Sequence, residues 1–100
     1  TRAEPLNRLA ELYRREDRFA EGYVVAKAGL TIPRPNDLLF VEQWSYDYGL
    51  LLECSVCAYW LGKYQECHDL TQKILAQENL PQNIKECAMR NLGFAKDKLR

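Results

Sequence analysis

The chain has 100 residues, a length that fits one domain with a hydrophobic core and leaves no room for a second. Hydrophobic residues make up 47% and charged residues 28%, as in a folded globular domain, which argues against intrinsic disorder. The 14 basic residues balance the 14 acidic residues, so we expect neither a nucleic acid nor an anionic membrane as partner. No apolar stretch has the length of a membrane span, and no signal peptide is recognisable.

The chain starts at Thr1, and its only methionine is Met89. We therefore expect residues 1–100 to form a single helical-repeat domain excised from a longer protein. The activity of that parent protein can then lie outside these residues.

The first hairpin is predicted from apolar spacing. A helix is expected over residues 4–16, because Leu6, Leu9 and Tyr13 recur on one helical face. The segment 14–18 follows as a turn, although no glycine marks it.

A second helix is expected to start near Phe19 and to end by Ile32, because Pro33 and Pro35 cannot continue it. Residues 33–43 then form a connector with four consecutive apolar residues, Leu38, Leu39, Phe40 and Val41. Burial of such side chains is favourable, so we expect this connector to fold back onto the helices, with Phe40 packed against them.

Three more helices are predicted in the second half of the chain. The third opens at residue 44 or 45 and extends to Leu61, with Gly62 as its stop. The fourth covers residues 64–77, and the fifth covers residues 82–99 after Leu80-Pro81. No useful β-alternation appears, so the predicted fold class is all-α.

One pattern occurs twice along the chain. Residues 17–22 and residues 62–67 each contain a turn, an aromatic residue, an acidic residue and then a small residue that opens a new apolar stripe. A repeated helix–turn–helix unit is typical of stacked helical hairpins whose surface binds a partner.

The residues of this repeat follow the tetratricopeptide pattern. Its first helix is matched by Leu6-x2-Leu9-Ala10-x2-Tyr13, Leu51-x2-Cys54-Ser55-x2-Ala58 and the half-copy Met89-x2-Leu92-Gly93. Its second helix is matched by Gly22, Ala26 and Gly29 before Pro33, and again by Cys67 and Thr71. The chain thus resembles tetratricopeptide repeats, which implies a right-handed solenoid of antiparallel hairpins with about five helices. The period of 45 residues exceeds the usual 34 or so, which leaves a generic array of antiparallel hairpins as the alternative.

A narrower resemblance covers residues 14–64. It rests on Gly29-Leu30-x-Ile32-Pro33, Leu38-Leu39-Phe40-Val41-Glu42, Tyr46-Asp47-Tyr48-Gly49-Leu50-Leu51 and Ala58-Tyr59-Trp60-Leu61-Gly62-Lys63-Tyr64. These residues look like the helical-repeat region attached to bacterial and viral glycosyltransferases, downstream of a nucleotide-sugar-binding catalytic domain. The resemblance implies a non-catalytic scaffold within a glycosyltransferase. A stand-alone peptide-binding adaptor is the competing function.

The cysteines suggest a metal site but fit a core better. All four lie in stretches of helical character: Cys54, Cys57, Cys67 and Cys87. Zinc-binding CxxC pairs usually sit on turns, whereas Cys54 and Cys57 are one helical turn apart at core positions. We therefore expect free thiols in a reducing cytoplasm and no metal or cofactor.

No catalytic residue is predicted either. His68 is the only histidine and has no placed nucleophile. The carboxylates of Glu42, Asp47 and Glu53 are explained by helix capping and solvation.

A binding groove is predicted where the first helices of the hairpins line up. The repeat register directs eight residues into it: Asn7, Glu11, Arg14, Leu52, Val56, Tyr59, Arg90 and Phe94. We expect a protein or peptide, or the parent's own catalytic domain, to bind there. The alternative is that these residues contact missing parts of the longer chain. The aromatics Trp44, Tyr46, Tyr48, Tyr59 and Trp60 add apolar surface nearby. The basic-and-asparagine pattern that clamps a peptide carboxylate in chaperone-binding tetratricopeptide domains is not matched, and Glu11 opposes it.

Overall fold

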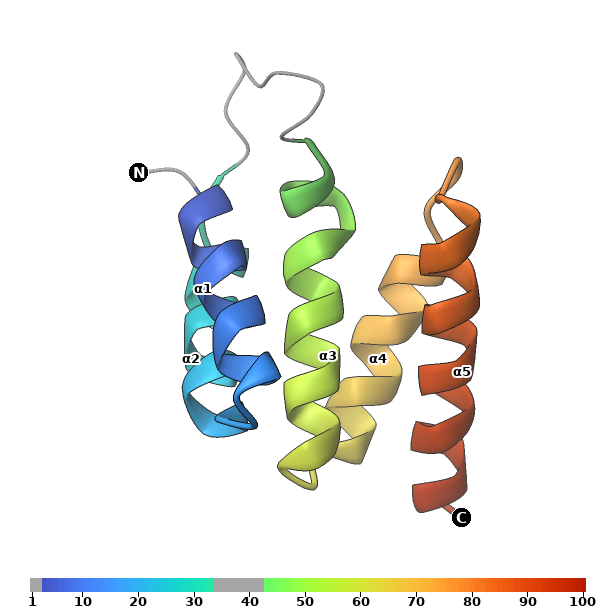
Figure 1. The fold of residues 1–100 in the computed structure, drawn as a ribbon. Coiled ribbons are helices and arrows are strands. Elements are labelled where there is room, and N and C mark those ends of the chain that lie inside the picture. The colour runs from blue at the N-terminus through green and yellow to red at the C-terminus, as the bar shows by residue number, and fades with distance from the viewer. Residues whose placement is uncertain (1–2, 34–42) are drawn as a thin grey trace.

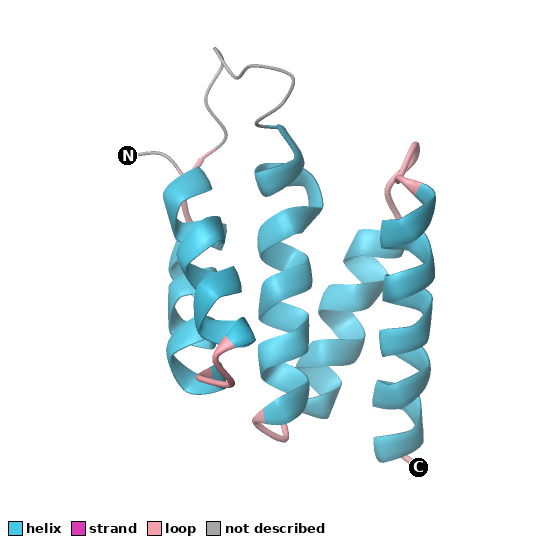
Figure 2. Cartoon of the chain, viewed as in Figure 1, coloured by secondary structure: helices cyan, strands magenta, loops and turns pink. Residues whose placement is uncertain are grey.

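The computed structural model describes residues 3–33 and 43–100. Five α-helices lie within these ranges, and no strand does: α1 (Glu4–Arg15), α2 (Phe19–Leu30), α3 (Leu50–Trp60), α4 (Tyr64–Leu75) and α5 (Gln82–Lys98) (Figure 2). The predicted all-α class is confirmed, and the helix ends agree closely with those expected from prolines, glycine and apolar spacing. None of these helices is long and apolar enough to cross a membrane.

The helices run alternately down and up and form two layers (Figure 1). Each helix packs against the next one along the chain, so α2 contacts α1 and α3, and α4 contacts α3 and α5. The helices α1, α3 and α5 also contact one another in sequence, and they form the front layer in Figure 1. This arrangement places the first helix of each hairpin on one side of the molecule.

The hairpins α1–α2 and α3–α4 repeat at an offset of 45 residues. The helix α1 ends at residue 15 and α3 ends at residue 60, while α2 spans residues 19–30 and α4 spans residues 64–75. The period read from the sequence is therefore the period of the structure.

The two hairpin turns share one backbone geometry. Asp17 in the first turn has φ of 60° and Gly62 in the second has φ of 81°, so both take the left-handed conformation that ends a helix. The backbone N–H of Arg18 donates to the carbonyl of Tyr13 at 2.8 Å, and the equivalent bond 45 residues later is also 2.8 Å. Asp17 thus takes the left-handed conformation that glycine usually takes at the end of a helix, which explains why no glycine marks this turn.

Small residues bring the helices close together. Two clusters form the core, Ala3, Ala10, Ala26, Leu50, Cys54 and Leu70 in one, and Ala58, Cys67 and Ala95 in the other. A Cβ atom on Gly22 would lie 2.9 Å from Sγ of Cys57 and 3.4 Å from the carbonyl oxygen of Ala10. The first two helices therefore approach each other closely at Gly22 and Ala10, and Cys57 brings α3 into the same contact.

The register of α5 differs from the predicted half-copy. Met89 is 56% exposed, and a Cβ on Gly93 would meet no atom within 4 Å, so neither residue occupies a packed position. The fully buried small residues of α5 are Ala88 and Ala95, which lie two helical turns apart. Because α5 packs on α4, the residues of α4 decide which face of α5 is buried. The repeat pattern does not predict this contact.

Two further expectations concern the region before α3. The predicted packing of residues 38–41, Phe40 included, lies outside the described residues. The third helix was expected to open at residue 44 or 45, and the π-helical segment η2, Ser45–Gly49, lies at this start.

Candidate binding face on α1, α3 and α5

The predicted groove residues gather around two hollows on the layer formed by α1, α3 and α5. Asn7, Glu11, Arg14 and Leu52 line the first hollow, which also contains Ile84 from α5. Val56, Tyr59 and Phe94 line the second. Arg90 lines neither and is exposed on α5.

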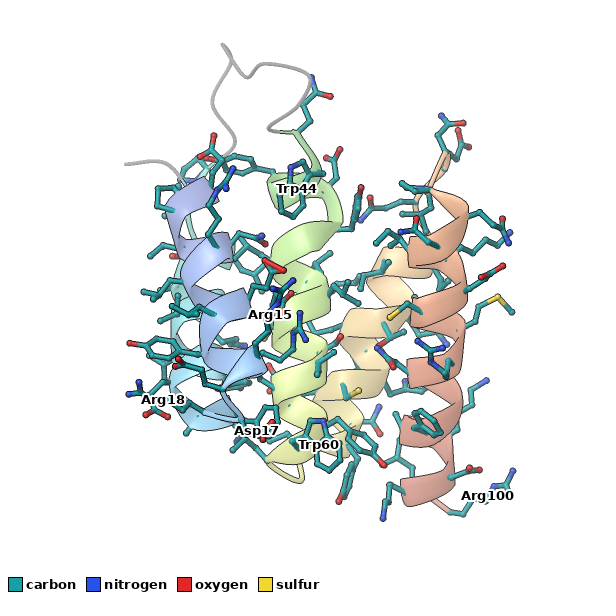
Figure 3. All side chains as sticks on the ribbon, viewed as in Figure 1. Arg15, Asp17, Arg18, Trp44, Trp60 and Arg100 are labelled. Carbon is teal, nitrogen blue, oxygen red and sulfur yellow. The ribbon has the colours of Figure 1, made fainter. Side chains whose placement is uncertain are left out.

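The first hollow, here named the α1–α3 pocket, has a volume of about 230 Å³. Beyond the predicted residues, its wall contains Trp44, Tyr48, Gly49, Glu53 and Ile84. Figure 3 shows Trp44 near the upper end of α3. The pocket therefore lies between α1, from Asn7 to Arg14, and the segment formed by η2 and the first turn of α3.

An ion pair between α1 and α3 forms one wall of this pocket. Nε and Nη2 of Arg14 donate to the two carboxylate oxygens of Glu53, with 3.1 Å between Nη2 and Oε1. Glu53 is only 6% exposed, and the hydrogen bond that its carboxylate accepts raises the pKa of Arg14. The expectation of a solvated or capping Glu53 was wrong, because Arg14 provides a partner 39 residues away in sequence.

Asn7 has an unusual position at the base of the pocket. It is 1% exposed, and its Oδ1 has no hydrogen-bond partner among the described residues. A Cβ on Gly49 would lie 2.6 Å from this oxygen and 2.7 Å from Cε3 of Trp44. The side chains of Asn7 and Trp44 therefore occupy the space that a side chain at position 49 would need. A buried acceptor without a donor costs about 1–3 kcal/mol, so Asn7 lowers stability here unless a donor reaches this oxygen.

The π-helical segment η2 is held from two sides. The hydroxyl of Tyr46 accepts a hydrogen bond from the backbone N–H of Ala3 at 2.7 Å and donates to Glu4 at 3.1 Å. On the other side, the amide of Gln77 donates to the carbonyl of Asp47. Single π-helical turns inside helices are frequent at functional sites, and this one positions Trp44 and Tyr48 over the pocket, with their ring centroids 6.4 Å apart.

The second hollow, here named the α3–α5 pocket, is smaller and mainly apolar. Its volume is about 140 Å³, and its wall consists of Val56, Tyr59, Trp60, Cys67, Asn91 and Phe94. Trp60, near the lower end of α3 in Figure 3, is 63% exposed although its ring stacks on Phe19 at a centroid distance of 5.7 Å. Phe94 is 50% exposed. Exposed aromatic rings around a hollow are typical of sites that bind a partner.

Three of the four cysteines lie in the core, as predicted, whereas Cys87 is partly exposed. Cys54, Cys57 and Cys67 are almost completely buried, and burial raises the pKa of Cys54 to about 12 and that of Cys57 to about 11. Such thiols are protonated and unreactive at neutral pH. Within residues 3–33 and 43–100, no three His, Cys, Asp or Glu side chains are grouped closely enough to hold a metal ion.

Two residues of these pockets carried a sequence signal that the repeat register did not use. Glu53 is a charge inside the apolar run that begins at Leu50, and a charge in such a run often has a buried partner. Gly49 precedes that run in a helical stretch, where glycine commonly marks a close approach. The contribution of Ile84 and Asn91 had no comparable signal.

In comparisons with known protein families, curated proteins and solved structures, the chain matches none of them. We therefore infer function from the residues of the two pockets.

Proposed function

We propose that this chain is a non-catalytic, tetratricopeptide-like binding module whose α1–α3–α5 face holds an extended segment of a protein. The observation that supports this function most directly is the alignment of two hollows on one face, which include Asn7, Glu11, Arg14, Leu52, Val56, Tyr59 and Phe94. The 45-residue repetition of helix ends and turns supports the tetratricopeptide-like, right-handed arrangement of hairpins.

At the level of the parent protein, we propose a cytoplasmic glycosyltransferase in which this module is a scaffold. This proposal depends on the resemblance of residues 14–64 and on the free thiols. The bound segment then belongs either to a separate protein or to the parent's own catalytic domain. A nucleotide-sugar-binding domain in the flanking sequence would support the scaffold, whereas its absence would favour the stand-alone adaptor.

The binding function is tested by selecting phage-displayed random dodecapeptides on the purified protein. Selected peptides should lose affinity for a Trp60→Ala/Phe94→Ala variant, because both rings are at least half exposed and line the α3–α5 pocket. The matched control is Val24→Ala, which truncates a 65% exposed residue on α2, away from both pockets. Selected peptides that bind the unsubstituted chain and both variants equally would refute this face as the binding site.

A further inference from the structure

Three residues contribute hydrogen-bond acceptors to the α1–α3 pocket. Asn7 contributes an unpartnered Oδ1, and Glu11 and Glu53 contribute carboxylates. Arg14 is the cation among the lining residues. A ligand that donates hydrogen bonds can therefore meet Oδ1 of Asn7 and the carboxylate of Glu11.

Arg14 is not available to bind an anion. Two of its N–H groups are engaged by both oxygens of Glu53, which neutralises the pair and fixes the plane of the guanidinium. The remaining carboxylate, that of Glu11, pairs at 3.0 Å with Arg15. Arg15 is 69% exposed, so solvent and salt weaken its compensation of the charge on Glu11. With Glu53 and Arg14 neutralising each other, the residues that line the pocket keep one net negative charge, that of Glu11.

The aromatic walls favour the same ligand. Trp44 and Tyr48 line the pocket with their ring centroids 6.4 Å apart, and aromatic rings attract Lys and Arg side chains by cation–π interaction. The ring of Trp44 is 37% exposed and meets the backbone at the same place as Oδ1 of Asn7.

The distance between the two pockets sets a spacing for the ligand. Along the helix that contains η2 and α3, Tyr48 and Leu52 line the α1–α3 pocket, and Val56 and Tyr59 line the α3–α5 pocket. At 1.5 Å per residue, the midpoints of these two pairs are about 11 Å apart along the helix axis. An extended peptide covers that distance with about three or four residues.

We propose that the segment bound to this face carries a Lys or Arg side chain for the α1–α3 pocket and, three or four residues away, an apolar side chain for the α3–α5 pocket. This inference rests on the proposed function and specifies its ligand. The ligand group proposed for the α1–α3 pocket is a cation, opposite in charge to a peptide carboxylate.

The test uses synthetic decapeptides with both ends blocked, containing one Lys and one Leu in a Ser/Gly background, at separations from one to six residues. Fluorescence polarisation should show the tightest binding at a separation of three or four. Replacing the peptide's Lys by Glu should weaken binding about tenfold or more, and replacing its Leu by Ser should do the same.

Protein variants separate the two pockets. Glu11→Gln preserves shape and removes the charge, so it should weaken the Lys peptide about threefold and leave the matched Gln peptide unchanged. Trp44→Ala should likewise weaken the Lys peptide selectively, whereas Trp60→Ala should act on the peptide's Leu. Circular dichroism spectra like that of the parent verify that each variant is folded.

The outcomes distinguish this inference from the proposed function. If phage-selected peptides depend on Trp60 and Phe94 but carry no basic residue, or if Glu peptides bind as well as Lys peptides, the ligand class is wrong and the binding face stands. If the selected peptides do not depend on Trp60 and Phe94, the binding face itself is refuted. Failure of every Lys–Leu peptide, while selected peptides bind the face, also overturns the inference.

Discussion

Gly22 on α2 is a position where the packing around the first hairpin leaves little room. A Cβ there would lie 2.9 Å from Sγ of Cys57, 3.4 Å from the carbonyl oxygen of Ala10 and 3.4 Å from Cβ of Tyr13. The contact with Ala10 is to backbone, so a larger side chain must separate α2 from α1 or displace α3. We therefore predict that Gly22→Leu destabilises the protein by about 1–3 kcal/mol through overpacking.

The matched control is Gly93→Ala on α5. Gly93 is also inside a helix, but a Cβ there would meet no atom within 4 Å. Alanine is favoured over glycine in a helix by about 1 kcal/mol, so Gly93→Ala should stabilise the protein by that amount. The two substitutions thus have opposite predicted signs, although both replace a helical glycine.

Urea unfolding followed by circular dichroism at 222 nm measures both effects. A loss of about 1–3 kcal/mol for Gly22→Leu should appear as a lower midpoint with an unchanged slope. For a domain of this size, a change of 1 kcal/mol corresponds to roughly 4–8 °C in melting temperature. A Gly22→Leu variant that unfolds like the parent would refute the repeat register.

Further predictions concern the ion pairs, the thiols and the connector. Glu53→Ala should destabilise the protein by about 3 kcal/mol in urea unfolding, because it leaves the partly buried guanidinium of Arg14 unpaired. A loss of stability below about 1 kcal/mol would contradict the buried ion pair. Burial disfavours the charged form of Glu66, but hydrogen bonds from its lysine and tyrosine partners outweigh burial and lower its pKa. The stability from Glu66 should therefore be complete above the pKa of the unfolded carboxyl and be lost as pH falls through the lower folded pKa, and an unfolding series in Glu66→Gln should lack this contribution. A thiol reagent at pH 8 should modify the partly exposed Cys87 first. A chelator should leave helix content and melting temperature unchanged. Stoichiometric zinc in the purified protein, with unfolding on its removal, would contradict the core role of the cysteines. Limited proteolysis should spare residues 35–43 if their apolar side chains are docked, and rapid cleavage there in a folded domain would show that they are not.

The helices and their hairpin period could be predicted because their signals are local. Apolar spacing, the stop at Gly62 and the prolines at positions 33 and 81 act within a few residues of where they stand. The turn at Asp17 followed from its equivalence to the turn at Gly62, although aspartate is a weaker signal for the left-handed conformation. Most of the predicted groove residues also reach the two pockets, because a helical register determines which side chains share a face.

The details of the pockets depend on contacts between residues far apart in the chain. Glu53 is buried because Arg14 approaches it across 39 residues, and the face of α5 is decided by its packing on α4. The π-helical start of α3 forms where Asn7 and Trp44 meet the bare backbone of Gly49, a convergence that no local pattern encodes. Burial and pairing are properties of the assembled helices, since the dielectric and the partners around a side chain exist only once distant segments have packed together.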